Sequence, residues 1–336
     1  MQEGYGILIY QTTNIGDEIQ SVAAMRYLPE KPDGYVFRDR TDKFKLPGQA
    51  KIENIKLIMN GWWTWKPKYF RPPACITPLL ISMHMRPKMD IPKHMRDYLI
   101  KHGPVGCRDK TTLERLQKLG IPAYYSGCLT LTIQRNPDIP KQDFVLAVDV
   151  SARVLEALRK QTDRPVYSIT PITNPIFSPT RRLEIAKVFL ALYQQAHCVV
   201  TSRLHAALPC LALETPILLL KEKEPRFEGL GDLAHRSTES EFLRSPGIFN
   251  IDSPPENLKQ YQSLREDLIR RCAEFTGINH STSRINDGNR LVTLINTFED
   301  DYEQLKRSLW RTDKADLLKN LLYRVFSGLK RRDIYW

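Results

Sequence analysis

Four consecutive residues, Ser202-Arg203-Leu204-His205, bring a hydroxyl, a guanidinium and an imidazole together within one short segment. The apolar, β-branched run before them, His197 to Thr201, predicts a buried strand, and the small apolar residues up to Leu213 predict a loop opening into a helix. Another buried strand is expected at Ile217 to Leu220. Parallel sheets bind ligands beyond the carboxyl ends of their strands and at helix N-termini, so this segment predicts an anion-binding site.

A second loop that could contact a ligand follows the first predicted strand of the chain, Gly6 to Tyr10. The loop contains Asn14, Gly16 and Asp17 and leads into a predicted helix that Pro29 ends. Glycine allows the backbone to approach a ligand closely, and Asn and Asp favour helix starts. For Asp17, the sequence leaves helix capping and ligand contact both open.

Three further side chains are candidates because of their positions. His84 closes a strand predicted at Leu79 to Met85, and Arg108 lies near the end of a short strand that begins at Val105. Arg226 belongs to a loop that can face a cleft between two domains. A single histidine at the end of a strand can serve structure or chemistry, and for His84 the sequence leaves both open.

The segment from Gly61 to Pro73 is aromatic and basic and contains several prolines, which indicates a loop over a binding face. Interleaved tryptophans and cations can stack on nucleic-acid bases or on sugars. The alternative is a loop that its tryptophans anchor in the protein core.

The composition narrows the class of protein. The chain has 336 residues, enough for two domains, and its 50 Lys+Arg against 38 Asp+Glu give a formal net charge of +12. This charge favours an anionic partner such as nucleic acid, an acidic membrane face or a phosphorylated small molecule, unless it reflects only a basic surface.

The N-terminus lacks a secretory signal pattern, and no stretch approaches the roughly 20 apolar residues of a membrane span. Six scattered cysteines indicate a reduced, cytosolic setting and no metal site.

Alternating strand and helix patterns divide the chain into two sheet domains. In the first half we expect a strand at Ile55 to Met59, a helix at Thr111 to Leu119 and a strand-like run at Tyr124 to Leu131. Residues 134–142 contain two prolines and an aspartate and predict a linker. The predicted boundaries are 1–137 for the N-terminal domain, 141–255 for the C-terminal domain and 256–336 for a helical region.

The second half repeats the alternation as a βαβαβαβ series, which is typical of a doubly wound domain. Strands are expected at Phe144 to Val150 and Pro165 to Thr170, and a helix at Arg181 to Gln195. At the end of the chain, Asp316 to Trp336 combines an apolar leucine stripe with basic residues. This pattern fits an amphipathic helix on an anionic membrane face, or a helix packed on the protein with a solvated basic side.

Several segments together resemble the polysaccharide pyruvyl transferase family. They are Asn14 to Ser21, Gly106 to Asp109 with Ser126 to Thr132, Val200 to Ala212, and the loop Arg226 to Leu230. Their order and spacing cover residues 5–235. The resemblance implies an α/β fold of two Rossmann-like, doubly wound domains facing a cleft, as in the B-type (GT-B) glycosyltransferases, with a helical C-terminal tail that it does not cover.

The resemblance also implies phosphoenolpyruvate as donor and a sugar of a glycan or lipid-linked oligosaccharide as acceptor, on which pyruvate forms a cyclic ketal. In the family the Arg-Leu-His motif lies at the donor site. We therefore expect Arg203 and Arg108 to hold the anionic donor, and His205 to act as general acid or to bind the departing phosphate. Asp17 is the expected base, and no cofactor or metal is required. The remaining expected substrate contacts are Leu204, Ser202, Asn14, Gly16, His84 and Arg226.

The sequence departs from the family at Glu214, where glycine is expected before Thr-Pro. If that position requires a positive φ, glutamate is strained there. We expect a cytoplasmic protein, in peripheral contact with the inner membrane face if the basic tail binds lipid. Competing hypotheses are a GT-B glycosyltransferase that uses a nucleotide sugar, and a nucleic-acid-binding protein. No acidic residue for a ribose stands out for the first, no known motif supports the second, and no nucleic-acid partner is expected.

Overall fold

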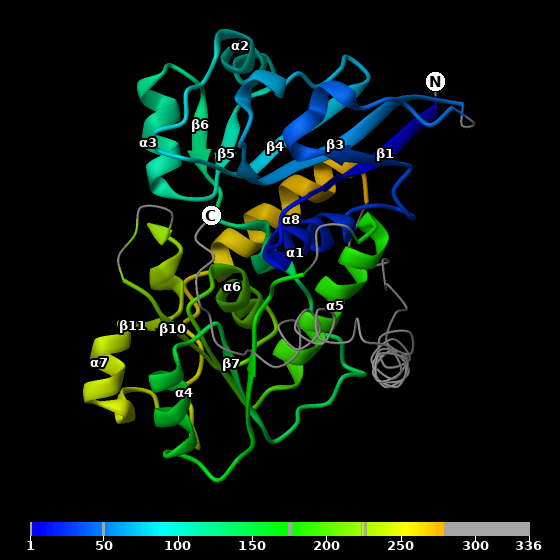
Figure 1. Ribbon diagram of the computed structural model, residues 1–336. Coiled ribbons are helices and arrows are strands. Elements are labelled where there is room, and N and C mark those ends of the chain that lie inside the picture. The colour runs from blue at the N-terminus through cyan, green and yellow to red at the C-terminus, as the bar shows by residue number, and fades with distance from the viewer. Residues whose placement is uncertain (1, 49–50, 174–176, 223, 225–226, 279–336) are drawn as a thin grey trace, which may run out of the picture.

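The computed structural model describes residues 2–48, 51–173, 177–222, 224 and 227–278, and these form two parallel sheets with flanking helices (Figure 1). The first sheet has the strand order β2-β1-β3-β4-β5-β6. Its strands are β1 (Gln2–Ile9), β2 (Gly34–Phe37), β3 (Ile52–Trp63), β4 (Ile76–Met85), β5 (Val105–Cys107) and β6 (Ala123–Tyr125). The helices between them are α1 (Ile15–Met25), α2 (Lys93–His102) and α3 (Lys110–Lys118).

The second sheet has the strand order β11-β10-β9-β7-β8. Its strands are β7 (Val145–Val148), β8 (Val166–Ile169), β9 (Cys198–Thr201), β10 (Ile217–Leu220) and β11 (His235–Ser237). The helices of this half are α4 (Ala152–Arg159), α5 (Pro179–Gln195), α6 (Leu204–Ala212), α7 (Glu239–Arg244) and α8 (Gln262–Thr276). All register pairs within both sheets are parallel. The predicted fold of two Rossmann-like, doubly wound sheets is therefore confirmed.

The two sheets share one apolar core. Ile15 and Ile19 of α1 belong to the same buried cluster as Val148 of β7 and Leu208 of α6. Figure 1 shows α1 and α8 between the two sheets. Helix α8 returns to the first sheet, where the Arg271 guanidinium lies 4.2 Å from the Tyr124 ring centroid. The predicted domain limits at 137, 141 and 255 stay predictions.

The loop after β1 is also joined to the segment after β8 by backbone hydrogen bonds. The amide of Ile15 donates to the carbonyl of Pro171 at 2.9 Å, and the amide of Thr173 donates to the carbonyl of Thr13 at 2.8 Å. Asn14 and Ile172 thereby form an antiparallel bridge. This bridge places the loop that follows β1 against the loop that follows β8.

Two predicted elements are wrong. Gly61, Trp62 and Trp63 are not loop but the last residues of β3, because Trp63 packs in the core and Trp62 pairs with His84 of β4. The run from Tyr124 to Leu131 is not one strand: β6 ends at Tyr125, Gly127 takes a φ of +71°, and a 3-10 helix follows at Leu129–Thr132. The positive φ suspected at Glu214 is confirmed, at +58°.

Within the described residues, no helix has both the length and the apolar character needed to cross a bilayer. The predicted amphipathic stretch Asp316 to Trp336 lies outside the described residues.

Candidate active site

The candidate site lies where the strand order reverses in each sheet. In the first sheet the reversal falls between β1 and β3, and in the second it falls between β7 and β9. Ligands of doubly wound folds bind beyond the carboxyl ends of strands at such reversal points, because the helices that follow the two strands leave on opposite faces. The loop with Asn14 and Asp17 follows β1, Asp149 follows β7, and Ser202 follows β9. The structure therefore places both predicted loops at the expected positions.

Residues from the two halves meet at a contact between Arg108 and His205. Arg108 follows β5, His205 lies in the first turn of α6, and Nη1 of the arginine donates to Nε2 of the histidine at 3.2 Å. The same Nη1 donates to Oε1 of Gln20 at 3.2 Å. A guanidinium has no acceptor atom, so in this contact Nε2 of the histidine is the acceptor.

Gly16 makes room for this histidine. A Cβ atom on residue 16 would lie 3.0 Å from both Cβ and Nδ1 of His205, closer than side chains normally pack. Asn14 caps α1 by accepting a hydrogen bond from the Gly16 amide at 3.1 Å. The capping role considered for Asp17 is therefore wrong, because Asn14 performs it.

Arg108 is a buried cation without a carboxylate partner. Only 3% of the residue is exposed, and no ion pair to it occurs within the described residues. Its Nε is buried and has no hydrogen-bond partner there. Burying an unpaired charge costs several kcal/mol. A guanidinium kept in this state is typical of a site that an anionic ligand completes.

Arg203, in contrast, is already paired. Its Nε donates to Oδ2 of Asp149, and the arginine side chain remains 32% exposed. Asp149 has a φ of +52°, and its carbonyl accepts a hydrogen bond from the Ser202 hydroxyl at 2.6 Å. Leu204 is buried in the core that both sheets share. Asp149 was not among the site residues predicted from the sequence. The feature that could have indicated it is its position directly after a buried strand.

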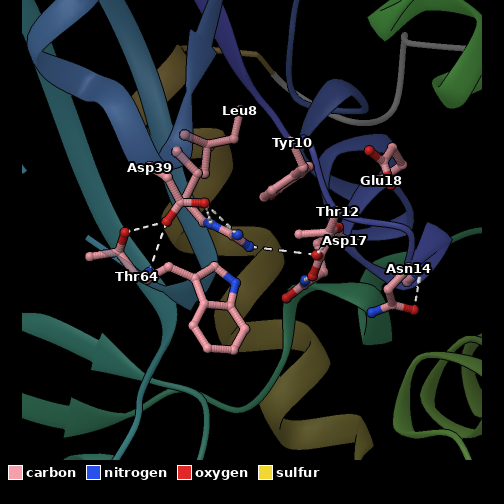
Figure 2. Close-up of polar contacts among 12 residues, drawn as sticks. Leu8, Tyr10, Thr12, Asn14, Asp17, Glu18, Asp39 and Thr64 are labelled. Atoms are coloured by element: carbon pink, nitrogen blue, oxygen red, sulfur yellow. Dashed lines mark hydrogen bonds and ion pairs between the residues drawn. The ribbon is translucent and has the colours of Figure 1, made fainter. Parts of the chain in front are cut away.

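Asp17 lies in a buried network of charges (Figure 2). Its Oδ2 accepts a hydrogen bond from the Thr12 hydroxyl at 2.7 Å and lies 3.5 Å from Nη1 of Arg38. Arg38 also binds Asp39 at 2.7 Å, and Asp39 accepts hydrogen bonds from Thr64 and from the Trp65 amide. Burial alone would raise the pKa of Asp39, but the Arg38 charge and these hydrogen bonds hold that pKa below its usual range. The sequence reading missed Arg38 and Asp39.

His84 is buried at the end of β4 and bound to a carboxylate. Its Nδ1 lies 2.6 Å from Oδ2 of Asp109, and the Thr112 hydroxyl lies 3.3 Å from the same nitrogen. Asp109 also caps α3 by accepting a hydrogen bond from the Thr112 amide. These contacts favour the structural alternative for His84, which orders the start of α3. Arg226 lies outside the described residues.

The loop that follows Arg226 contacts the first half of the chain. The Glu228 carbonyl accepts a hydrogen bond from the Lys110 amide at 3.3 Å, and its carboxylate accepts one from the Thr111 hydroxyl at 3.0 Å. The Tyr125 hydroxyl donates to the Gly229 carbonyl at 2.6 Å. This loop therefore closes one side of the junction between the two sheets. Among the described residues, no group of three or more His, Cys, Asp or Glu side chains has a metal-binding arrangement.

An ion pair also joins the two halves. Nε and Nη2 of Arg182, on α5, both lie 2.7 Å from Oε1 of Glu18, on α1, and only 3% of the glutamate is exposed. Burial raises the pKa of Glu18 to about 8, although the Arg182 charge opposes that shift. The ionisation of Glu18 therefore changes near neutral pH.

Comparison with solved structures finds matches at low identity and low TM-score. The UDP-GlcNAc 2-epimerase of Methanocaldococcus jannaschii, in complex with UDP-GlcNAc and UDP, is 10% identical with a TM-score of 0.39, covering 80% of this chain and 98% of the epimerase. S. aureus MnaA in complex with UDP is 12% identical with a TM-score of 0.43, covering 83% and 98%. The glycosyltransferase SnogD of Streptomyces nogalater is 10% identical with a TM-score of 0.33, covering 87% and 99%. No curated protein matches the sequence.

A family model gives the more specific result. The model for polysaccharide pyruvyl transferase matches residues 14–223, which include the Asn14–Asp17 loop, Arg108 and the Ser202–His205 segment. This range is more than half of the 336 residues. The chain belongs to the polysaccharide pyruvyl transferase family.

Proposed function

We propose that this protein transfers pyruvate from phosphoenolpyruvate to a sugar of a glycan or lipid-linked oligosaccharide and forms a pyruvate ketal. Membership of the family supports a transferase that acts on polysaccharide. The observation that carries the finer proposal is Arg108, a buried guanidinium without a carboxylate partner in the described chain, in contact with His205 from the other sheet. A small, highly charged anion is the ligand that this pair fits best.

The donor would bind between the two halves. Phosphoenolpyruvate carries about three negative charges near neutral pH, and a phosphate that contacts Arg108 supplies the missing counter-charge. Arg203 supplies the second cation, which Asp149 holds in position through its ion pair. Ser202 lies beside this ion pair, and the proposed contacts of Asn14 and Gly16 come from the loop after β1.

His205 would handle the first proton. An anion that draws the Arg108 guanidinium toward itself leaves Nε2 of His205 able to take up a proton, and the negative charge of the donor favours the imidazolium. The imidazolium then gives its proton to C3 of the enol, which leaves C2 cationic. A sugar hydroxyl adds to C2, the C2–O bond to phosphate breaks, and a second hydroxyl closes the ketal.

The protons balance in this scheme. Two hydroxyls each lose one proton; one replaces the proton that C3 gained, and the other leaves with inorganic phosphate. Asp17 is the proposed acceptor for a hydroxyl proton. Its contacts with Arg38 and Thr12 hold the carboxylate in a defined orientation, as a general base requires.

The test is phosphate release from phosphoenolpyruvate together with a mass gain of about 70 Da on the glycan, as a pyruvate ketal requires. We expect His205→Ala, Arg203→Ala and Arg108→Gln each to abolish both signals. The matched control is His235→Ala, because that histidine lies on β11 and contacts the Glu256 carbonyl, and it should leave turnover unchanged. Full turnover in both the His205 and the Arg203 variants would remove these residues from the mechanism. Thermal stabilisation by a nucleotide sugar, without any by phosphoenolpyruvate, would favour a glycosyltransferase instead.

A further inference from the structure

Two indole rings and one guanidinium gather beside the proposed donor site. The ring centroids of Trp62 and Trp65 are 4.6 Å apart, and the Arg86 guanidinium lies 5.6 Å from the first ring and 4.7 Å from the second. Trp65 is 55% exposed, and Trp62 and Arg86 are half-buried. Trp62 is the penultimate residue of β3 and Arg86 follows β4, so the cluster lies at the carboxyl edge of the first sheet. We call these three residues the tryptophan–arginine platform.

Arg86 has no neutralising carboxylate among the residues that the structure describes. Within the described part of the chain no carboxylate forms an ion pair with it, and its buried Nε has no hydrogen-bond partner. Arg38 makes the contrast clear, because it also stacks on the Trp62 ring, at 4.9 Å, but pairs with Asp17 and Asp39. Of these two cations, Arg86 is therefore the one that can bind an external anion.

The surrounding sequence strengthens the positive field. From Gly61 to Met89 the chain contains no acidic residue, whereas it contains five cations, Lys66, Lys68, Arg71, Arg86 and Lys88. Lys66, Lys68 and Arg71 are exposed on the segment after β3. Clusters of one sign raise the local concentration of ligands of the opposite sign, so this edge of the sheet attracts anions.

A continuous set of contacts links the platform to Arg108. The Arg38 guanidinium lies on the Trp62 ring and reaches Asp17 at 3.5 Å. Gln20 bridges the rest of the distance, with Nε2 3.5 Å from Oδ1 of Asp17 and Oε1 accepting from Arg108 at 3.2 Å. Asp17, the proposed base, therefore lies between the platform and the proposed donor site.

We propose that the tryptophan–arginine platform binds the acceptor, and that it selects a sugar with a negative charge beside the ring, either a glycosyl phosphate or a uronate. The proposal rests on the proposed function, because it assigns the second substrate of that reaction. Indole rings stack on the apolar face of a sugar, and Arg86 holds the phosphate or carboxylate by charge-assisted hydrogen bonds. A sugar held there presents its hydroxyls toward Asp17.

Direct binding without phosphoenolpyruvate tests this proposal. Tryptophan fluorescence or calorimetry would compare glucose 1-phosphate, methyl glucuronide and neutral methyl glucoside on the full-length protein. We expect at least one anionic sugar to bind about tenfold more tightly than the neutral one, and the two anionic probes distinguish a phosphate from a carboxylate source. Arg86→Gln should remove this preference, and Trp65→Ala should weaken binding of all three probes about tenfold. The matched control is Arg40→Gln, which removes an arginine that also stacks on an aromatic ring, Tyr69, but pairs with Asp42.

Three results would overturn the proposal. They are equal affinity for neutral and anionic sugars, no binding of any of the three probes, and a preference that survives Arg86→Gln. A single-stranded oligonucleotide that binds more tightly than the sugars, with the same dependence on Arg86 and Trp65, would make the platform a nucleic-acid site instead. The donor site is tested separately, by the thermal stabilisation that phosphoenolpyruvate alone gives the wild type and by its loss in Arg108→Gln. A negative result for the platform therefore does not bear on the proposed donor site.

Discussion

Replacing Arg108 with methionine should separate the stability of the protein from its affinity for the donor. Methionine removes a buried unpaired charge, which relieves a desolvation cost of several kcal/mol. It also removes the guanidinium hydrogen bonds to Gln20 and His205, worth about 1.5–3 kcal/mol each. The two effects oppose each other, so we expect the free energy of unfolding without ligand to change by no more than about 1 kcal/mol.

The response to phosphoenolpyruvate should change much more. At about 100 times its Kd a ligand stabilises the folded protein by about 2.7 kcal/mol. Loss of one charge-assisted contact worth about 1.5–3 kcal/mol weakens binding roughly 10- to 100-fold. At the same concentration the stabilisation of the variant then falls to about 0.4–1.4 kcal/mol. Thermal or urea unfolding with and without phosphoenolpyruvate measures both quantities.

Arg38→Met is the matched control, because Arg38 is equally buried but binds two carboxylates. Removing it strands Asp17 and Asp39, and we expect a loss of about 3–5 kcal/mol without ligand. If Arg108→Met is destabilised as strongly as Arg38→Met, Arg108 is a structural residue and not a residue kept for the donor. Equal stabilisation of wild type and Arg108→Met by phosphoenolpyruvate would exclude Arg108 from the donor site.

Three further predictions concern single positions. Gly16→Ala should lower kcat/KM about 100-fold with little change in the unfolding midpoint, because the new Cβ displaces the His205 ring. Unchanged turnover would show that residue 16 does not position this ring. The folded-state pKa of Glu18, about 8, exceeds its ordinary value of 4.5, so folding takes up a proton between those values and the free energy of unfolding should fall as pH rises through that window. Urea titrations at pH 5, 6.5 and 8 should show this fall in wild type and a smaller one in Glu18→Gln, and identical slopes would refute it. Glu214→Gly should raise the free energy of unfolding by about 0.5–1 kcal/mol by relieving a positive φ, whereas Glu214→Ala should give no such gain.

The sequence identified the strands and loops of the site because these depend on local pattern. The buried runs at Val105 and at His197 to Thr201, and the loop with Asn14 and Gly16, all lie where their apolar periodicity and turn residues indicated. The positive φ of Glu214 could also be predicted, because glutamate occupies a position where the family resemblance implies glycine.

The partners of the site residues were not readable in the same way. Asp149 meets Arg203 across 54 residues of sequence, and Gln20 meets Arg108 across 88, so no local spacing reveals either pair. The aromatic, basic and proline-containing composition of Gly61 to Pro73 predicts a loop, yet cross-strand pairing with His84 and Met85 extends β3 through Trp62 and Trp63. Tertiary contacts here override local preference.

The core that α1 shares with β7 and α6 has a consequence for dissecting the molecule. A cut in the segment between the sheets would leave one fragment with Ile15 and Ile19 uncovered and the other with Leu208 uncovered, since these residues cover one another in the intact chain. Each fragment would also lose backbone partners at the Asn14–Ile172 bridge. The two halves, expressed separately, should therefore aggregate through their exposed apolar surfaces. Co-expression should allow them to fold together.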